Sequence, residues 1–178
     1  MDRVALIVTD MLNPYDHEDA DVLADNVAGM VHAVARLVEE AGESDVELVY
    51  VNDNYGDFAA TRDDLVRRAL EGRRPELIEP IVPPEGVAFL QKARHSAFYS
   101  TALDHLLRQR SIDTFVLAGQ VTEQCILYTA LDAYIRHFDI RVATDAVAHI
   151  DPELGDAALR MMQRNMSVDI LEATTALS

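Results

Sequence analysis

The sequence predicts an α/β fold, a three-layer α/β/α sandwich whose mainly parallel sheet has six strands. Short apolar runs bounded by turn residues alternate along the chain with longer segments whose apolar residues repeat at helical spacing. Strands that alternate with helices form right-handed βαβ units, which place helices on both faces of a parallel sheet. No repeat, linker or low-complexity tract interrupts the sequence, so we expect a single domain over residues 1–178.

The first half of the chain carries clear strand and helix signals. The run from Val4 to Thr9 has the continuous hydrophobicity of a strand buried on both faces. Gly42 is typical of a helix end, and Thr61 is a suitable N-cap. In order, we expect a strand at 4–9, a helix at 19–41, a strand at 46–51, a helix at 61–71, a proline-rich loop at 72–86 and a strand at 87–91.

The second half continues the alternation. Ser100 or Thr101 is expected to cap a helix, and Gly119 marks the turn between a strand and the helix that follows it. In order, we expect a helix from 100 or 101 to 110, a strand at 113–118, a helix at 123–137, a strand at 140–143, a helix at 152–165 and a strand at 168–171.

Charge excludes several classes of partner. The chain has 31 acidic and 15 basic residues, a formal net charge of −16. Proteins that bind duplexes or anionic membranes normally concentrate positive charge in a patch, so we expect neither nucleic acid nor membrane as a partner. No apolar run approaches the roughly 20 residues of a membrane helix, and the N-terminus lacks the pattern of a secretory signal. A cytoplasmic location is therefore expected.

Cys125 is the only cysteine in the chain. A disulfide within the chain and a zinc site built on several thiolates are both excluded. An inert buried thiol and a reactive thiol both remain possible. The residues around Cys125 distinguish these two possibilities, because a thiol's reactivity depends on its surroundings.

Polar residues follow several of the predicted strands. Asp10 comes directly after the first strand, Asp53 after the second and Lys92 after the third, while Cys125 lies six residues past Gly119. Ligands of open parallel sheets bind beyond the carboxyl ends of the strands. An acid, an amine and a thiol are therefore expected to converge at one edge of the sheet, although Asp10 alone is typical of a turn and Lys92 alone of a solvated rim.

The local setting of Cys125 favours a reactive thiol. The segment from Gly119 to Cys125 is a strand-to-helix junction, and Thr122 is the expected N-cap. Backbone N–H groups and the positive end of a helix favour a thiolate, and the same groups can hold an oxyanion. With Lys92 as a nearby cation and Asp10 as a proton acceptor, these residues form an activated nucleophile and its base.

Three segments resemble the motifs of the isochorismatase-like cysteine hydrolases, the superfamily of nicotinamidases and N-carbamoylsarcosine amidohydrolases. They are Ala5-Leu-Ile-Val-Thr-Asp-Met-Leu-Asn13, Lys92-Ala-Arg-His-Ser-Ala-Phe98 and Gly119-Gln-Val-Thr-Glu-Gln-Cys125, the last continuing to Thr129-Ala130 and Asp132-Ala133. The matches occur in the family's order and span nearly the whole chain. The only lysine and the only cysteine of the chain both fall on the family's catalytic positions.

The resemblance implies a catalytic triad of Asp10, Lys92 and Cys125 on a Rossmann-like sandwich with a six-stranded parallel sheet. Asp10 would take the thiol proton and return it to the leaving amine, while Lys92 would lower the pKa of the thiol. Cys125 would form an acyl- or carbamoyl-enzyme thioester that water hydrolyses. The resemblance also implies an oxyanion hole made of the Val121 and Cys125 N–H groups, and a cis peptide bond between Gln120 and Val121.

Departures from the family's patterns limit the reaction. Nicotinamidases place metal-binding histidines just after the second-strand aspartate, but no histidine occurs between Asp53 and His95 here. We therefore expect no metal site and no cofactor. True isochorismatases, which cleave a vinyl ether, usually lack the cysteine, so Cys125 argues against that reaction.

Substrate contacts are less well defined by the sequence. We name Tyr15, Asp53, Phe98 and Tyr99 as candidate substrate-binding residues, with core packing as the alternative for the three aromatic residues. His95 lies near the predicted site, where a surface or structural role is favoured over substrate contact.

The favoured hypothesis is a metal-independent hydrolase that cleaves an amide or ureido C–N bond of a small molecule. The alternatives are another cysteine chemistry such as ester hydrolysis, a catalytically silent member that binds a ligand or partner, and a thiol redox sensor, which would need a second molecule because the chain has no resolving cysteine. The resemblance also implies a homo-oligomer, a dimer or a tetramer.

Overall fold

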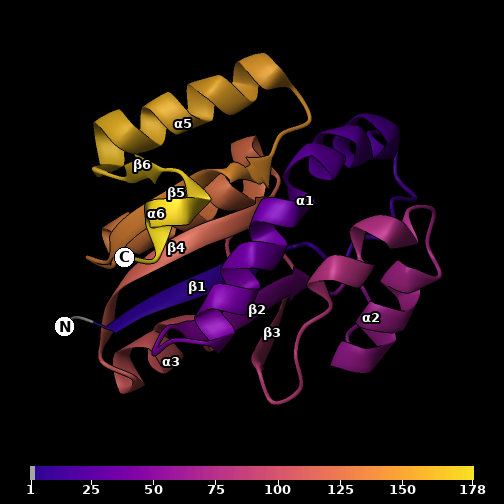
Figure 1. Cartoon of the computed structure of the whole chain (residues 1–178), viewed down its shortest axis with the longest axis horizontal. Coiled ribbons are helices and arrows are strands. Elements are labelled where there is room, and N and C mark those ends of the chain that lie inside the picture. Colours follow the sequence, from indigo (N-terminus) through magenta and orange to yellow (C-terminus); the bar gives the residue numbers. More distant parts are fainter. Residues whose placement is uncertain (1–2) are drawn as a thin grey trace.

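A six-stranded sheet with the strand order β3-β2-β1-β4-β5-β6 forms the centre of the protein (Figure 1). The computed structural model describes residues 3–178, and every neighbouring pair of strands in it is parallel. The strands are β1 (Arg3–Thr9), β2 (Glu47–Asp53), β3 (Ala88–Lys92), β4 (Ile112–Gln120), β5 (Asp139–Ala148) and β6 (Asp169–Leu171).

Helices connect the strands and cover the sheet. The α-helices are α1 (Ala20–Gly42), α2 (Arg62–Leu70), α3 (Leu103–Gln109), α4 (Leu127–Ile135), α5 (Pro152–Met166) and α6 (Ala173–Ala176). Two short 3-10 helices, η1 (Pro75–Leu77) and η2 (Glu79–Ile81), lie between α2 and β3, and a π-helix, η3 (Thr122–Ile126), precedes α4.

Alternate residues of the central strands enter two separate cores. On β1, Leu6 and Val8 belong to the core that α1 and α6 cover, and α1 lies in front of the sheet in Figure 1. Ala5 and Ile7 belong to the core on the other face, beneath α3, α4 and α5. Since successive side chains of a strand point to opposite faces, a strand between two helical layers has to be apolar throughout. The predicted three-layer sandwich is confirmed.

Some local predictions hold and others need correction. Thr61 caps α2 as predicted, and its side chain forms a reciprocal capping box with Asp64. The expected loop at 72–86 contains η1 and η2, because Pro75 and Pro80 occupy the first turns of short helices. The predicted caps of α3 are wrong: Ala102 is the N-cap, while Thr101 Oγ1 accepts a hydrogen bond from the backbone N–H of Leu103.

The strand β5 is longer than predicted, and α6 was not predicted at all. Thr144 and Asp145 interrupt the apolar pattern of β5, but both have structural partners. Thr144 donates a hydrogen bond to the Leu171 carbonyl (3.2 Å), and Asp145 accepts one from the Ala173 N–H (2.7 Å) at the start of α6. A helix of four residues is too short to show a hydrophobic period in the sequence.

Over residues 3–178, no helix is both long enough and apolar enough to cross a membrane.

Gly119 allows β4 to approach β1 closely just before β4 ends. Its φ angle is +118°, which L side chains rarely adopt, and a Cβ atom at this position would lie 2.1 Å from the carbonyl oxygen of Thr9. Thr9 pairs with Gly119 in the sheet. A side chain here would therefore force apart the strands that lead to Asp10 and to η3.

We predict that Gly119→Ala lowers the free energy of unfolding by more than about 2 kcal/mol, through backbone strain and the clash with Thr9. Urea denaturation followed by circular dichroism measures the effect. Gly29→Ala is the matched control, because Gly29 lies within α1 and a Cβ there meets no atom within 4 Å. It should stabilise the protein by up to about 1 kcal/mol. Equal effects of the two substitutions would contradict the steric argument.

Candidate active site

Four polar residues meet at the carboxyl edge of the sheet. Asp10 follows β1, Asp53 and Lys92 are the last residues of β2 and β3, and Cys125 lies in η3 just after β4. The strand register pairs Asp53 with Lys92. The convergence predicted at one edge of the sheet is present in the structure, because all of these strands run in the same direction.

Lys92 lies between two carboxylates and the thiol. Its Nζ is 2.8 Å from Asp10 Oδ2 and 3.8 Å from Asp53 Oδ2. The same ammonium group donates hydrogen bonds to Cys125 Sγ (3.5 Å) and to the carbonyl oxygen of Arg94 (3.0 Å). The Lys92 side chain is completely buried. A buried ammonium is costly unless it is paired and hydrogen-bonded, and these contacts meet that requirement.

Asp10 is held rigidly by the ends of the neighbouring strands. It has a left-handed backbone conformation (φ 55°), and its N–H donates to the Val51 carbonyl (3.0 Å). Its Oδ1 accepts a hydrogen bond from the backbone N–H of Asp53 (2.7 Å). The Gln120 side chain donates to its carbonyl oxygen (2.7 Å). Residues of β2 therefore hold both the backbone and the carboxylate of Asp10, and Gln120 at the end of β4 holds its backbone.

Burial and charge shift the pKa values of all three central groups. Desolvation raises the pKa of Asp10, although the positive charge of Lys92 opposes this. For Lys92, desolvation lowers the pKa, but attraction to Asp10 and Cys125 is stronger in sum and raises it overall. Lys92 therefore stays charged, and the raised pKa makes Asp10 a better proton acceptor than a solvated carboxylate.

The pKa of the Cys125 thiol is raised, contrary to the expectation of a favoured thiolate. Desolvation is the largest cause and repulsion by Asp10 the next, and together they outweigh the lowering by Lys92. Lys92 acts in the direction that the family resemblance implies, but its effect is smaller than that of burial. Burial and the Asp10 carboxylate therefore favour the neutral thiol over the thiolate, beside the contact between Asp10 and Lys92.

Cys125 lies in a π-helix rather than in the first turn of an α-helix. Val121 is the N-cap of this element, and Thr122, the predicted N-cap, is its first residue. Val121 and Cys125 are both buried. The peptide bond between Gln120 and Val121 is cis. The apolar pattern of the sequence could not reveal this start, because a single turn of five residues is too short to show a hydrophobic period.

His95 is closer to the thiol than the sequence suggested. Its Nδ1 lies 3.7 Å from Cys125 Sγ, and its ring packs against Tyr128 with a centroid distance of 5.3 Å. Unlike Lys92 and Asp10, His95 is exposed to solvent. The interpretation of His95 as a surface or structural residue is therefore incomplete, since it contacts the sulfur of Cys125.

The segment that carries His95 is anchored to α4. Ser96 Oγ donates a hydrogen bond to the Asp132 carboxylate, which also accepts one from Arg136 (2.7 Å). The backbone N–H of Ala97 donates to Thr129 Oγ1 (2.9 Å). These contacts explain why the second and third motifs occur together, because each supplies partners for the other.

The candidate substrate-binding residues have different surroundings. Tyr15 is buried, its hydroxyl accepts a hydrogen bond from Gln120 Nε2 (3.4 Å), and burial raises its pKa to about 12. Asp53 faces Lys92 and also accepts a hydrogen bond from the Tyr55 N–H (2.7 Å). Tyr15 contacts the Gln120 side chain that also bonds to Asp10, and Asp53 lies beside Lys92. Both residues therefore support the positions of Asp10 and Lys92.

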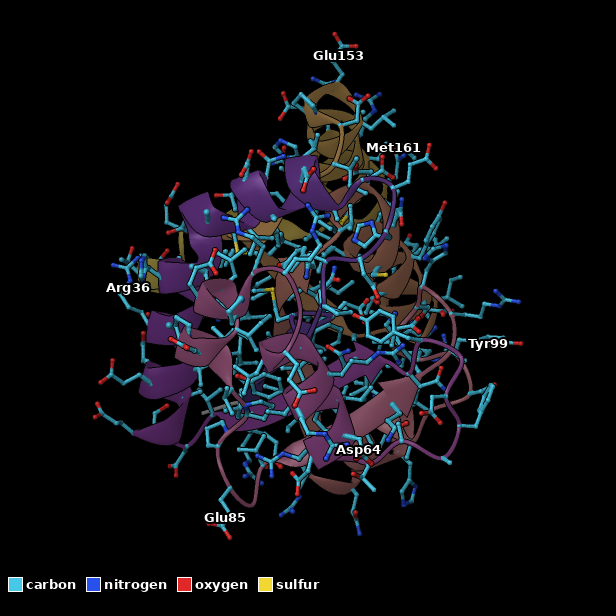
Figure 2. The ribbon with its side chains drawn as sticks, turned by 90° about the vertical axis from the view of Figure 1, so that its right-hand side faces the viewer. Arg36, Asp64, Glu85, Tyr99, Glu153 and Met161 are labelled. Atoms are coloured by element: carbon cyan, nitrogen blue, oxygen red, sulfur yellow. The ribbon has the colours of Figure 1, made fainter. Side chains whose placement is uncertain are left out.

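Phe98 and Tyr99 point in different directions. Phe98 is buried against Phe115 and Phe138, with centroid distances of 6.1 and 5.7 Å, in the core beneath α4. Its packing corresponds to the core alternative stated for it. Tyr99 is 57% exposed and extends away from the body of the molecule (Figure 2). Among the described residues, the side-chain hydrogen bonds and ion pairs of Cys125, Asp10 and Lys92 involve neither Phe98 nor Tyr99.

Two further residues near the site were missed by the sequence reasoning. Asn52 Oδ1 accepts a hydrogen bond from the Leu12 N–H (2.9 Å), and its Nδ2 donates to the Leu12 carbonyl (3.3 Å). The Tyr55 hydroxyl donates to the same carbonyl (2.8 Å). Both fix the loop after Asp10. The signal that could have identified Asn52 is an asparagine directly after the apolar run that ends at Val51.

Between residues 3 and 178, no group of three or more histidine, cysteine, aspartate and glutamate side chains is arranged to hold a metal ion.

Comparison with known proteins identifies the family. The family model described as the isochorismatase domain matches residues 4–174, nearly the whole chain. The chain belongs to the isochorismatase family. An uncharacterized isochorismatase family protein, YaaI of Bacillus subtilis, is 31% identical over 93% of this chain and 92% of its own length.

Other members of the family have named activities. The maleamate amidohydrolase of Pseudomonas putida is 30% identical to the chain over 84% of it and 75% of the relative. The structure of N-carbamoylsarcosine amidase from Thermoplasma acidophilum superimposes with a TM-score of 0.75, at 30% identity over 96% of each chain. The family thus includes hydrolases of amide and ureido bonds.

We predict that substitutions of the two charged neighbours change the reactivity of the thiol in opposite directions. Asp10→Asn removes the repulsion that raises the Cys125 pKa, so alkylation by iodoacetamide at pH 8 should accelerate about tenfold for each unit by which the pKa falls. Lys92→Met removes the positive charge that lowers the Cys125 pKa, so alkylation should slow. Intact-mass spectrometry measures both rates without ambiguity, because Cys125 is the only thiol.

His105→Gln is a suitable control for these measurements, since His105 is exposed on α3. Equal alkylation rates in Asp10→Asn, Lys92→Met and the unsubstituted protein would show that neither charge acts on the thiol.

Proposed function

We propose that the protein is a cysteine hydrolase that cleaves an amide or ureido C–N bond of a small molecule through a thioester at Cys125. The observation that supports this most strongly is the buried Lys92 ammonium, within 2.8 Å of Asp10 and 3.5 Å of Cys125. A buried ion pair contributes little to stability compared with apolar packing, so its presence beside a thiol favours a chemical role.

The first half of the proposed reaction transfers the acyl group to sulfur. Asp10 accepts the proton of the Cys125 thiol, and the sulfur attacks the substrate carbonyl carbon. The backbone N–H groups of Val121 and Cys125 are proposed to stabilise the oxyanion that develops. As the C–N bond breaks, Asp10 returns its proton to the departing amine nitrogen. The raised pKa of Asp10 suits a group that both takes and gives a proton.

The neutral resting thiol fits this sequence of steps. Because burial raises the pKa of Cys125, the proton leaves sulfur only as a base accepts it and as the carbonyl carbon approaches. Lys92, which stays charged throughout, stabilises negative charge on Asp10 before the transfer and on sulfur after it. The second half of the reaction, hydrolysis of the thioester by water, restores the thiol.

The named relatives suggest the class of substrate to test first. One is named a maleamate amidohydrolase and another an N-carbamoylsarcosine amidase. Maleamate, N-carbamoylsarcosine and nicotinamide form a compact panel that covers amide and ureido bonds.

We predict that Cys125→Ala abolishes release of ammonia from any compound of this panel that the unsubstituted protein hydrolyses, with a loss of at least about 1,000-fold. Ammonia release in a coupled assay measures the loss, and circular dichroism establishes that the variant is folded. Full activity in a folded Cys125→Ala variant would contradict the proposal. An unreactive Cys125 with no turnover would instead support a ligand-binding member of the family.

We also predict an acidic limb in the pH dependence of kcat/KM that lies above pH 3.8, the ordinary pKa of an aspartate. Asp10 acts as a base only when ionised, which requires a pH above its pKa, and burial raises that pKa. Activity should therefore be lost as the pH falls through the raised value. A limb at or below pH 3.8, in protein that circular dichroism shows to be folded, would exclude Asp10 as the base.

A homo-oligomer, dimer or tetramer, is a further prediction from the family resemblance. Sedimentation velocity tests it, and a monomer at all concentrations would contradict it.

A further inference from the structure

His95 and Asp10 approach the sulfur of Cys125 in different environments. Asp10 and Lys92 are buried at the ends of the strands, whereas His95 is exposed to solvent. His95 Nδ1 lies 3.7 Å from Sγ, within the range of a hydrogen bond to sulfur. Among the side chains of Asp10, Lys92 and His95, only that of His95 is exposed, so it is the neighbour of the sulfur that water from solvent reaches most directly.

Both oxygens of Asp10 already have close partners. Oδ1 accepts the Asp53 N–H at 2.7 Å, and Oδ2 lies 2.8 Å from Lys92 Nζ. Once the thioester has formed and the amine has left with the proton, Asp10 is again a carboxylate in its ion pair with Lys92. His95, the exposed neighbour of the sulfur, is then placed to receive the proton of a water molecule that arrives from solvent.

The imidazole is held in place for such a role. The ring packs on Tyr128, and the next two residues of the chain are bonded to α4 through Asp132 and Thr129. In its neutral form an imidazole has one ring nitrogen without a proton, which can accept a proton from water. A rigid ring at a fixed distance from sulfur meets the geometric requirement for a general base.

We propose that His95 is a catalytic residue of the second half-reaction, in which it accepts the proton of the water molecule that hydrolyses the Cys125 thioester. This inference rests on the proposed function. The water oxygen forms a bond to the thioester carbon as one of its protons moves to the imidazole. The C–S bond then breaks, the sulfur receives that proton from the imidazolium, and the acid leaves. The free thiol and the neutral imidazole are restored.

A small activated ester allows each half of the reaction to be measured separately without knowledge of the natural substrate. 4-Nitrophenyl acetate transfers its acetyl group to a reactive thiol and releases 4-nitrophenolate, so one equivalent should appear as a burst. The acetyl-enzyme is then isolated by desalting, and its decay is followed by intact-mass spectrometry. Cys125→Ala shows whether the label is on sulfur, because the chain has no other cysteine.

We expect His95→Asn to slow the decay of the acetyl-enzyme on the order of 100-fold, the usual contribution of a general base. The burst and the rate of iodoacetamide alkylation should stay within about twofold of those of the unsubstituted protein, because His95 takes no part in acylation. Hydroxylamine, which attacks thioesters without a general base, should deacylate both proteins at similar rates. His95→Gln provides a second variant, and His105→Gln controls for loss of an exposed histidine elsewhere.

Three results would overturn the inference. Decay at the unsubstituted rate in both His95 variants would exclude a role in hydrolysis. A slower burst and slower alkylation, with unchanged decay, would assign His95 to thiol activation instead. A failure of the unsubstituted protein to form any acetyl-enzyme at Cys125 would contradict the proposed thioester itself, and this is distinguishable because it does not depend on His95.

Discussion

The buried ion pair between Lys92 and Asp10 is the interaction on which the candidate site depends. An ammonium and a carboxylate that are removed from water need each other and need further hydrogen bonds, which come from the Asp53 backbone and the Arg94 carbonyl. Asp10, Asp53, Lys92 and Arg94 lie at or just after the ends of β1, β2 and β3, which are neighbours in the sheet. The position of Cys125 then follows, because Lys92 also contacts its sulfur.

The fold was largely predictable because both faces of the sheet are buried. Continuous apolar strands, helices with one apolar face and the alternation between them are direct consequences of a three-layer packing. Features that depend on tertiary contacts were harder to predict from the sequence. The polar part of β5 and the short α6 depend on Asp145, whose partner is a backbone N–H 28 residues further along the chain. No local pattern in the sequence carries that information.

The candidate site shows the same division. Asp10, Lys92 and Cys125 were placed together by the rule that strand ends converge and by the family's motifs, and they do lie in contact. The protonation state of Cys125 was not predictable in this way. Proximity to a lysine suggested a thiolate, but the balance depends on how deeply the sulfur is buried and how close Asp10 lies. The contact between His95 and the sulfur was not predicted for a similar reason. The distance between them is set by hydrogen bonds between the loop that carries His95 and α4.

The neutral resting thiol also affects how the protein tolerates oxidants. Hydrogen peroxide reacts with thiolates, and the path from sulfenic to sulfinic and sulfonic acid begins with that charged form. A sulfur whose pKa is raised by burial and by a neighbouring carboxylate presents little thiolate to such oxidants. Because the chain has no second cysteine to resolve a sulfenic acid as a disulfide, a low population of thiolate protects its single sulfur from irreversible oxidation.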